Sequence, residues 1–198
     1  MRFLIWCCFV FNITAGQTQK NDLDNFFHKG GRFYSTGAEY VTSLDTDKDI
    51  EVYSFRLGYG SFPFKNISLQ ATLDLSGTTG YRKITMDNNT DIFNADSFAI
   101  GTSFLLRWYF LKLGSAALFL DIGAGILYGF KSFPPGGTKL NFTARPGGGL
   151  AIELDSKTKL VVGLNRFHLS NGQGYKHPFN PAFDGLGISV GLVFGMDK

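Results

Sequence analysis

A histidine, a serine and an aspartate in the last third of the chain have the types and spacing of a nucleophilic site. His168 and Ser170 lie two positions apart in an alternating segment, and Asp184 begins the next such segment. On a β-strand, residues two apart share a face about 6.6–6.8 Å apart at the backbone, a gap that an imidazole can close toward a hydroxyl. A carboxylate opposed on the neighbouring strand can reach the other imidazole nitrogen. The pattern indicates a serine activated by a histidine base that Asp184 orients.

Groups that can hold an oxyanion follow this serine. The run Asn171-Gly172-Gln173-Gly174 offers amide donors next to Ser170, and such donors stabilise the tetrahedral intermediate of acyl transfer. A His-x-Ser tripeptide alone is weak evidence, because it occurs by chance in many chains. On the residues alone, polar side chains that anchor a strand at an interface are the simpler interpretation.

Positive side chains around this segment are candidates for binding phosphate. They are Arg166 on the same alternating segment and Lys176 and His177 in the loop that follows. Solvated charges are the alternative interpretation, since most loop cations have no binding role. No metal-ligand spacing and no phosphate-binding glycine loop occurs in the sequence. We therefore expect neither a metal nor a cofactor.

The segments that must position these residues alternate with period two, which is typical of β-strands. Between residues 66 and 76, for example, the apolar Ile67, Leu69 and Ala71 share one face, and the polar Ser68 and Gln70 share the other. Eight such segments occur, near residues 33–44, 50–60, 66–76, 96–111, 115–130, 140–154, 157–170 and 184–195. Pro146 interrupts the sixth segment and indicates a bulge or kink there.

Strand length and polarity favour a membrane barrel over a soluble sandwich. Several segments run ten residues or more, which suits the roughly 9–11 residues of a tilted membrane strand, whereas soluble strands usually hold about 5–6. Charges on the polar face rarely survive unpaired in a soluble core, but they can pair across a small lumen crowded with glycine. The sequence therefore predicts an all-β, eight-stranded antiparallel transmembrane β-barrel. The charged residues are Glu39, Arg56, Arg107, Asp121, Arg145 and Glu153.

The connections agree with an up-and-down barrel whose outer loops are long and whose inner turns are short. Short turns are expected at residues 61–65, 112–114 and 155–156, and long outer loops at 77–95, 131–139 and 171–183. The first outer connection, residues 45–49, is the short exception.

Composition narrows the function classes further. The 198 residues carry a formal charge of +3 with no block of five or six like charges, so no nucleic-acid partner is expected. The sequence contains no run of about 18 apolar residues, the length that a membrane-spanning helix needs. Arg2, an apolar run over 3–11 and small residues up to Gly16 have the features of a secretory signal. We expect a signal peptide over residues 1–16, which contains both Cys7 and Cys8, and one barrel domain over 17–198.

The last hairpin carries a resemblance to a known family. It resembles the C-terminal hairpin of the outer-membrane lipid A 3-O-deacylases, the PagL-type enzymes, in Asn165-Arg166-Phe167-His168-Leu169-Ser170-Asn171 and Asn180-Pro181-Ala182-Phe183-Asp184. The resemblance implies an eight-stranded barrel in the outer membrane of a Gram-negative bacterium. It also implies a lipid-facing serine triad that hydrolyses the acyl ester at position 3 of lipid A.

Carried across residue by residue, the resemblance implies His168 as the base, Ser170 as the nucleophile and Asn171 as the oxyanion-hole asparagine. Asp184 stands where the family has glutamate, and Gln173 stands where the family often has glycine. Gly172 or Gly174 would then supply the second oxyanion donor. The implied partners are lipid A in lipopolysaccharide and other outer-membrane lipids, while a homodimer is left open.

Two other functions remain open at this point. One is a non-enzymatic small barrel with a structural or adhesive role, in which the hairpin residues only anchor the rim. The other is an esterase on the same scaffold that acts on phospholipid.

Overall fold

The computed structural model describes residues 27–86, 89–171 and 181–196, so the predicted signal peptide lies outside the described residues. The described chain is all β, and its paired strands run antiparallel to each other. No helix in this part of the chain is long and apolar enough to cross a membrane. The strands are β1 (Arg32–Ser43), β2 (Lys48–Phe64), β3 (Ile67–Met86), β4 (Asn89–Asn94), β5 (Ser97–Leu113), β6 (Ala116–Phe133), β7 (Thr138–Glu153), β8 (Thr158–Ser170) and β9 (Phe183–Gly195).

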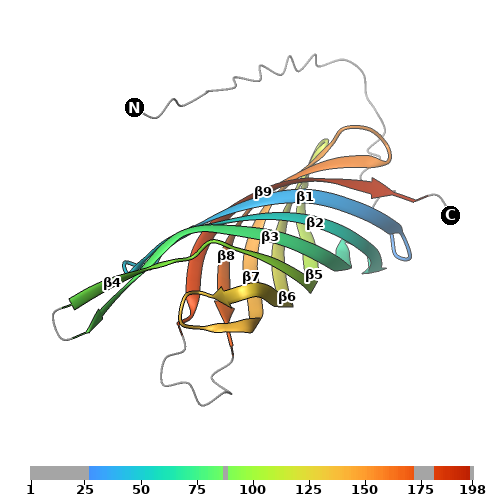
Figure 1. Cartoon of the computed structure of the whole chain (residues 1–198). Helices are drawn as coiled ribbons and strands as arrows, with labels where there is room; N and C mark the ends of the chain where they lie inside the picture. Colours follow the sequence, from blue (N-terminus) through green and yellow to red (C-terminus); the bar gives the residue numbers. More distant parts are fainter. Residues whose placement is uncertain (1–26, 87–88, 172–180, 197–198) are drawn as a thin grey trace.

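Eight of these strands close into a ring, as the sequence predicts. From β1 the ring runs through β9, β8, β7, β6, β5 and β3, and the pairing of β2 with β3 closes it (Figure 1). Each strand pairs with a sequence neighbour, except where β1 meets β9 and where β3 meets β5 around the short β4. Closure removes free sheet edges from the barrel wall, a requirement for strands surrounded by lipid.

One expected loop is instead a two-stranded ribbon. The sequence predicts a loop over residues 77–95, but β3 continues to Met86 and pairs with β4 from Tyr81↔Asn94 to Met86↔Asn89. Figure 1 shows this ribbon extending beyond the neighbouring strands. The segment lacks one-sided apolar alternation because both of its faces are largely exposed, while pairing between the two arms satisfies the backbone. The polar composition of this segment therefore does not distinguish a loop from a solvent-exposed pair of strands.

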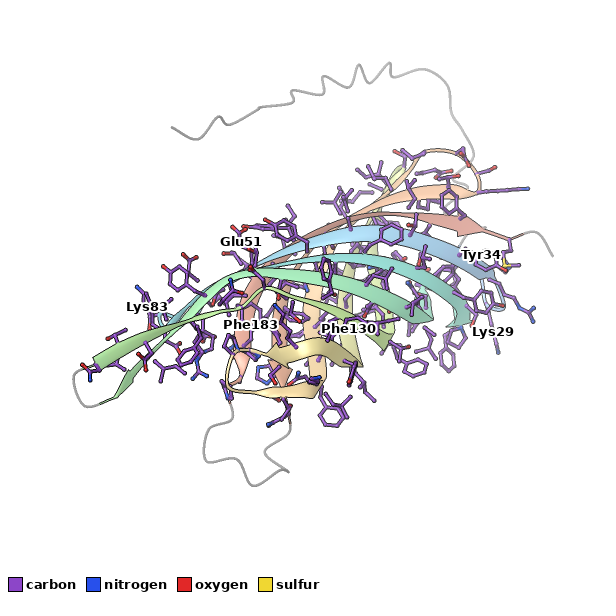
Figure 2. The ribbon with its side chains drawn as sticks, viewed as in Figure 1. Lys29, Tyr34, Glu51, Lys83, Phe130 and Phe183 are labelled. Atoms are coloured by element: carbon purple, nitrogen blue, oxygen red, sulfur yellow. The ribbon has the colours of Figure 1, made fainter. Side chains whose placement is uncertain are left out.

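The outer wall of the barrel is apolar and bounded by charges. Alternate residues on most barrel strands expose large hydrophobic side chains, Phe104 and Leu164 among them. Figure 2 shows Lys29 and Lys83 at opposite ends of the molecule, with the barrel wall between them. Aromatic pairs lie toward both ends, since Tyr34 packs on Tyr59 near the short turns and Tyr40 on Tyr53 near the loops. This distribution is typical of a wall that faces lipid.

The middle of the barrel holds a network of paired charges. Glu39 forms ion pairs with Arg56 and Arg145, and Arg145 Nη1 lies 3.1 Å from Asp74 Oδ2. Arg107 donates to both oxygens of Asp121 at 2.7 Å. Pairing in a small lumen is what the sequence predicts for these charges. Glycine lets side chains pack beside them, because a Cβ at Gly58 would collide with the Gln70 side chain.

Apolar clusters close the interior on both sides of this network. The cluster toward the short turns contains Phe27, Phe33, Phe62, Tyr109 and Phe119, and the one toward the loops contains Phe133, Phe167, Leu169 and Phe183. Phe27 stacks on Tyr109 with ring centroids 4.1 Å apart. The barrel is therefore filled by side chains, as expected for eight strands.

Pro146 does not cause the bulge that the sequence indicates. The register between β7 and β8 is the same at Ala144↔His168 as at Gly147↔Asn165, and only the pairing of the residues between them is interrupted. Proline has no N–H to donate, so the ladder loses bonds locally without gaining a residue. The interruption lies directly beside the segment that carries the candidate site.

Candidate active site

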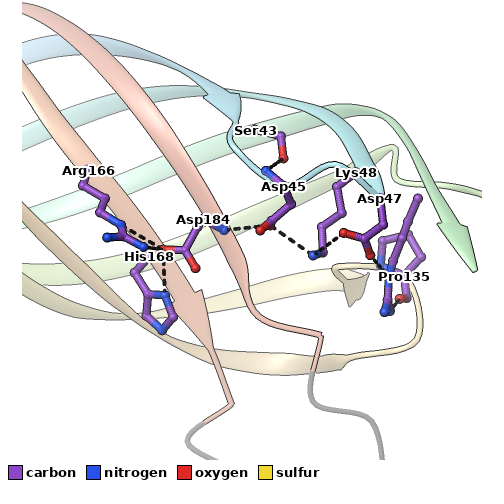
Figure 3. A network of polar contacts seen from close by, with 9 residues as sticks. Ser43, Asp45, Asp47, Lys48, Pro135, Arg166, His168 and Asp184 are labelled. Carbon is purple, nitrogen blue, oxygen red and sulfur yellow. Dashed lines mark hydrogen bonds and ion pairs between the residues drawn. The ribbon is translucent and has the colours of Figure 1, made fainter.

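The candidate acid and base face each other across two neighbouring strands. His168 on β8 is opposite Asp184 on β9 in the antiparallel register, and Asp184 Oδ1 lies 3.2 Å from His168 Nδ1. The imidazole is 40% exposed and the carboxylate 22%, while the flanking Phe167 and Leu169 are buried in the interior. Both polar side chains therefore point outward, at the end of the barrel where the strands meet the loops (Figure 3).

This contact determines which imidazole nitrogen can act as a base. An ionised carboxylate only accepts hydrogen bonds, so the proton of a neutral imidazole belongs on Nδ1, where it is donated to Asp184. Nε2 then carries the lone pair and can accept a proton. Asp184 thus occupies the position from which a carboxylate orients a histidine base.

Arg166 is the third member of this outward cluster. Its Nε and Nη2 donate to Asp184 Oδ1 at 3.1 and 3.0 Å, on the oxygen that also contacts His168. The guanidinium is 63% exposed. This contact is not among the roles that the sequence predicts for Arg166, although the two-residue spacing from His168 places both side chains on the outward face that Asp184 shares.

Ser170 follows His168 on the same face of β8, where the strand ends. Within the described residues no hydrogen bond joins its hydroxyl to the imidazole, and catalytic hydrogen bonds are often long until substrate binds. Asn171 directly follows and is buried. The remaining candidates Gly172, Gly174, Lys176 and His177 lie outside the described residues.

The interior of the barrel holds the strand that carries the site. Asn165 points inward and donates from Nδ2 to Glu39 Oε1 at 2.7 Å, and the Arg145 guanidinium lies 4.7 Å from the centre of the Phe167 ring. These inward contacts alternate with the outward Arg166 and His168. Packing on the inward face thus fixes the strand backbone from which the outward side chains project.

The connection between β1 and β2 also contacts the site, although no sequence pattern predicts this contact. Leu44 N–H donates to the backbone oxygen of Asp184 at 2.9 Å, and the backbone N–H of Asp184 donates to Asp45 Oδ2 at 3.2 Å. Asp45 and Asp184 are 139 positions apart in the sequence. Only the closure of the ring between β1 and β9 brings them together.

An apolar groove lies on the same outward wall. It has a volume of about 580 Å³ and forms where the small Ala38 leaves space between larger neighbours. Ile188 borders it, four residues along β9 from Asp184, or about 13 Å at a strand's rise per residue. The groove is lined mainly by Tyr40, Tyr53, Phe55, Leu75, Val162 and Val190. Such a groove beside a polar site can accept a hydrocarbon chain.

No metal site accompanies this cluster. Among the residues that the structure describes, no group of three or more His, Cys, Asp or Glu side chains is arranged to hold a metal ion.

Comparison with known proteins identifies the family. The lipid A 3-O-deacylase (PagL) family matches residues 53–193, which include the whole outward cluster. The chain belongs to the lipid A 3-O-deacylase family. It is accordingly an outer-membrane protein of a hydrolase family whose substrate is lipid A. The family match gives no support for a homodimer.

Solved structures agree with this family in fold. Neisserial surface protein A is 11% identical with a TM-score of 0.56, and the comparison covers 82% of this chain and 96% of that one. The outer membrane protein OprG from Pseudomonas aeruginosa is 10% identical with a TM-score of 0.53, covering 86% and 98%. At these identities the likeness concerns the barrel alone. No curated protein matches the chain.

Proposed function

We propose that this member of the family is a serine esterase that removes the acyl chain linked at position 3 of lipid A and releases a 3-hydroxy fatty acid. Family membership supports the substrate. The observation that carries the mechanism is the contact of His168 Nδ1 with Asp184 Oδ1 on the lipid-facing wall. Ser170 lies two residues after His168 on the same strand.

Each candidate residue has one task in this proposal. Ser170 Oγ attacks the ester carbonyl while His168 Nε2 takes its proton, and Asp184 holds the imidazole and stabilises its charged form. Asn171 and the amide of Gly172 or Gly174 stabilise the oxyanion. His168 then gives the proton to the 3-oxygen of the sugar, and the deacylated sugar leaves as an alcohol. Water, activated by the same histidine, hydrolyses the acyl-serine ester.

The outward position of the site suits a substrate that stays in the membrane. The acyl chain would lie in the groove beside Ile188, while the phosphates would meet Arg166, Lys176 and His177. Arg166 retains donors for this purpose, since a guanidinium has five N–H groups and only Nε and Nη2 contact Asp184. The ester need not enter water to reach the serine.

Mass spectrometry of lipid A tests the proposal. A Gram-negative host expresses the wild-type chain, Ser170→Ala or Ser115→Ala, each confirmed as folded protein in the outer membrane. Ser115 is the matched control because it is exposed in the turn between β5 and β6, at the opposite end of the barrel. Wild type and Ser115→Ala should remove one 3-linked hydroxyacyl chain, and Ser170→Ala should not.

The other outcomes identify the alternatives. Loss of a chain from phospholipid with unchanged lipid A would assign a phospholipid substrate. Unchanged lipids in every sample would contradict the enzymatic proposal, and equal activity in Ser170→Ala would exclude this serine as the nucleophile.

A further inference from the structure

One outer connection, residues 44–47, binds both the backbone N–H and the backbone oxygen of Asp184. Regular pairing between β1 and β9 ends at Ser43↔Gly185, one residue short of Asp184. Beyond it, the Asp45 carboxylate accepts the Asp184 N–H in place of a strand carbonyl, while Leu44 N–H donates to the Asp184 oxygen. The start of β9 therefore depends on a side chain where the ladder stops.

The Asp45 carboxylate is itself fixed by a chain of charges, drawn in Figure 3. Lys48 Nζ lies 3.0 Å from Asp45 Oδ2 and 3.2 Å from Asp47 Oδ1, and the lysine side chain is only 7% exposed. Arg82 Nε contacts Asp47 Oδ2 at 3.3 Å, and Arg82 Nη1 donates to Pro135 O at 2.8 Å. These contacts link the β1–β2 connection, the β3–β4 ribbon and the β6–β7 connection to Asp184, the residue that faces His168.

Local electrostatics favour the ionised form of Asp47. Partial burial raises the pKa of Asp47, but hydrogen bonding and the positive charges of Lys48 and Arg82 outweigh it and hold that pKa below its ordinary value. A lysine as buried as Lys48 needs such partners, since ammonium groups are almost never buried alone.

We propose that Asp45 is a positioning residue that holds the Asp184 backbone so that Oδ1 stays against His168 Nδ1. The inference rests on the proposed function. An aspartate has only two side-chain torsions, so the place of its carboxylate follows its backbone more closely than a glutamate's would. A displacement of about 1 Å at such a site can cost on the order of 100-fold in rate.

Kinetics of single variants test the role of the carboxylate. Asp45→Ala should lower kcat by about 10- to 100-fold and leave KM for lipid A within about two-fold. Asp45→Asn keeps an acceptor oxygen and should recover most of kcat. Asp47→Ala is the matched control, because it breaks contacts to Lys48 and Arg82 without touching Asp184. Wild-type kcat in Asp45→Ala, or an equal loss in Asp45→Asn or Asp47→Ala, would overturn the proposal.

A double-mutant cycle asks whether Asp45 acts through Asp184. In the Asp184→Asn background, adding Asp45→Ala should change kcat by less than about two-fold, because the contact that it positions is already weakened. If the fold-losses in kcat of the two single variants multiply in the double variant, Asp45 acts independently of Asp184, which would contradict the inference.

A measurement without substrate separates this inference from the proposed function. In detergent micelles, ¹⁵N-histidine NMR of the unliganded full chain reports whether Nδ1 or Nε2 of His168 carries the proton, with the signal assigned by its loss in His168→Asn. Asp45→Ala should reduce the Nδ1–H population, and Asp47→Ala should not. An unchanged population would overturn the positioning role. If Asp45→Ala shows the expected change while the wild-type chain leaves lipid A intact, the positioning role stands and the proposed function is rejected.

Discussion

In the proposed triad, Asp184 takes the place that the resemblance assigns to glutamate, with a side chain one methylene shorter. Cross-strand opposition brings Oδ1 within 3.2 Å of His168 Nδ1, so the missing methylene is offset by register. We expect Asp184→Asn to keep the fold and to lower kcat by about 10³- to 10⁴-fold, since an amide in this place favours the wrong imidazole tautomer. Hydrolysis of lipid A in mixed micelles by purified barrel measures the loss.

Asp184→Glu is the matched variant for that experiment, because it keeps the charge and the acceptor. It should retain activity, with the longer side chain reaching the same nitrogen. Full activity in Asp184→Ala would remove this residue from the triad altogether.

We expect Arg166 to contribute to substrate binding more than to the chemical step. Because its ion pair with Asp184 is largely exposed, Arg166→Gln should change the free energy of unfolding by less than about 1 kcal/mol. Loss of one exposed phosphate contact should raise KM by roughly five-fold, or about 1 kcal/mol, with kcat nearly unchanged. Steady-state kinetics on bisphosphorylated lipid A and on its monophosphorylated form distinguish the two effects. A larger fall in kcat than rise in KM would assign Arg166 to orienting Asp184 instead.

The sequence predicts the local part of this site and misses the distant part. Strand alternation places His168 and Ser170 on one outward face, and the last hairpin brings Asp184 to them. Asp45 could not be found in this way, because its contact depends on the closure of β1 against β9 and on the level at which their register ends. A side chain that completes a strand ladder leaves no periodic pattern.

The strands of the barrel are predicted well wherever lipid and lumen enforce alternation, and poorly where they do not. In the β3–β4 ribbon most side chains on both faces are exposed or half-buried, so the ribbon has no one-sided apolar pattern and the sequence indicates a loop. Pro146 misleads for a related reason: its missing donor interrupts pairing with β8 without shifting register.

The tip of the β3–β4 ribbon should be dispensable for folding. Its described interactions, such as the hydroxyl contact of Thr85 with Thr90, stay within the ribbon. Replacing residues 84–91 by Asn-Gly, a dipeptide suited to a two-residue hairpin, leaves Arg82 and its contacts in place. The shortened chain should show the wild-type urea midpoint in a gel-shift assay of folded barrel. A lower midpoint would mean that the tip supports the barrel wall.

The charged layer inside the barrel works as one unit. Arg145 is buried between Glu39 and Asp74, so Arg145→Met would leave two carboxylates sharing Arg56. Breaking a buried charge network in this way costs about 3–5 kcal/mol. Urea unfolding of the barrel in detergent measures this, with Arg166→Gln as the exposed control. Equal urea midpoints for the two variants would indicate that water inside the barrel screens the interior charges.

The two apolar clusters that close the interior have an electrical consequence. Buried aromatic side chains pack together in both clusters, and the cavity beside Arg56 and Gln70 between them has a volume of only about 60 Å³. A planar bilayer that takes up this protein should therefore show no stepwise rise in current under an applied voltage. The host could then hold many copies of this barrel without adding to the permeability of its outer membrane.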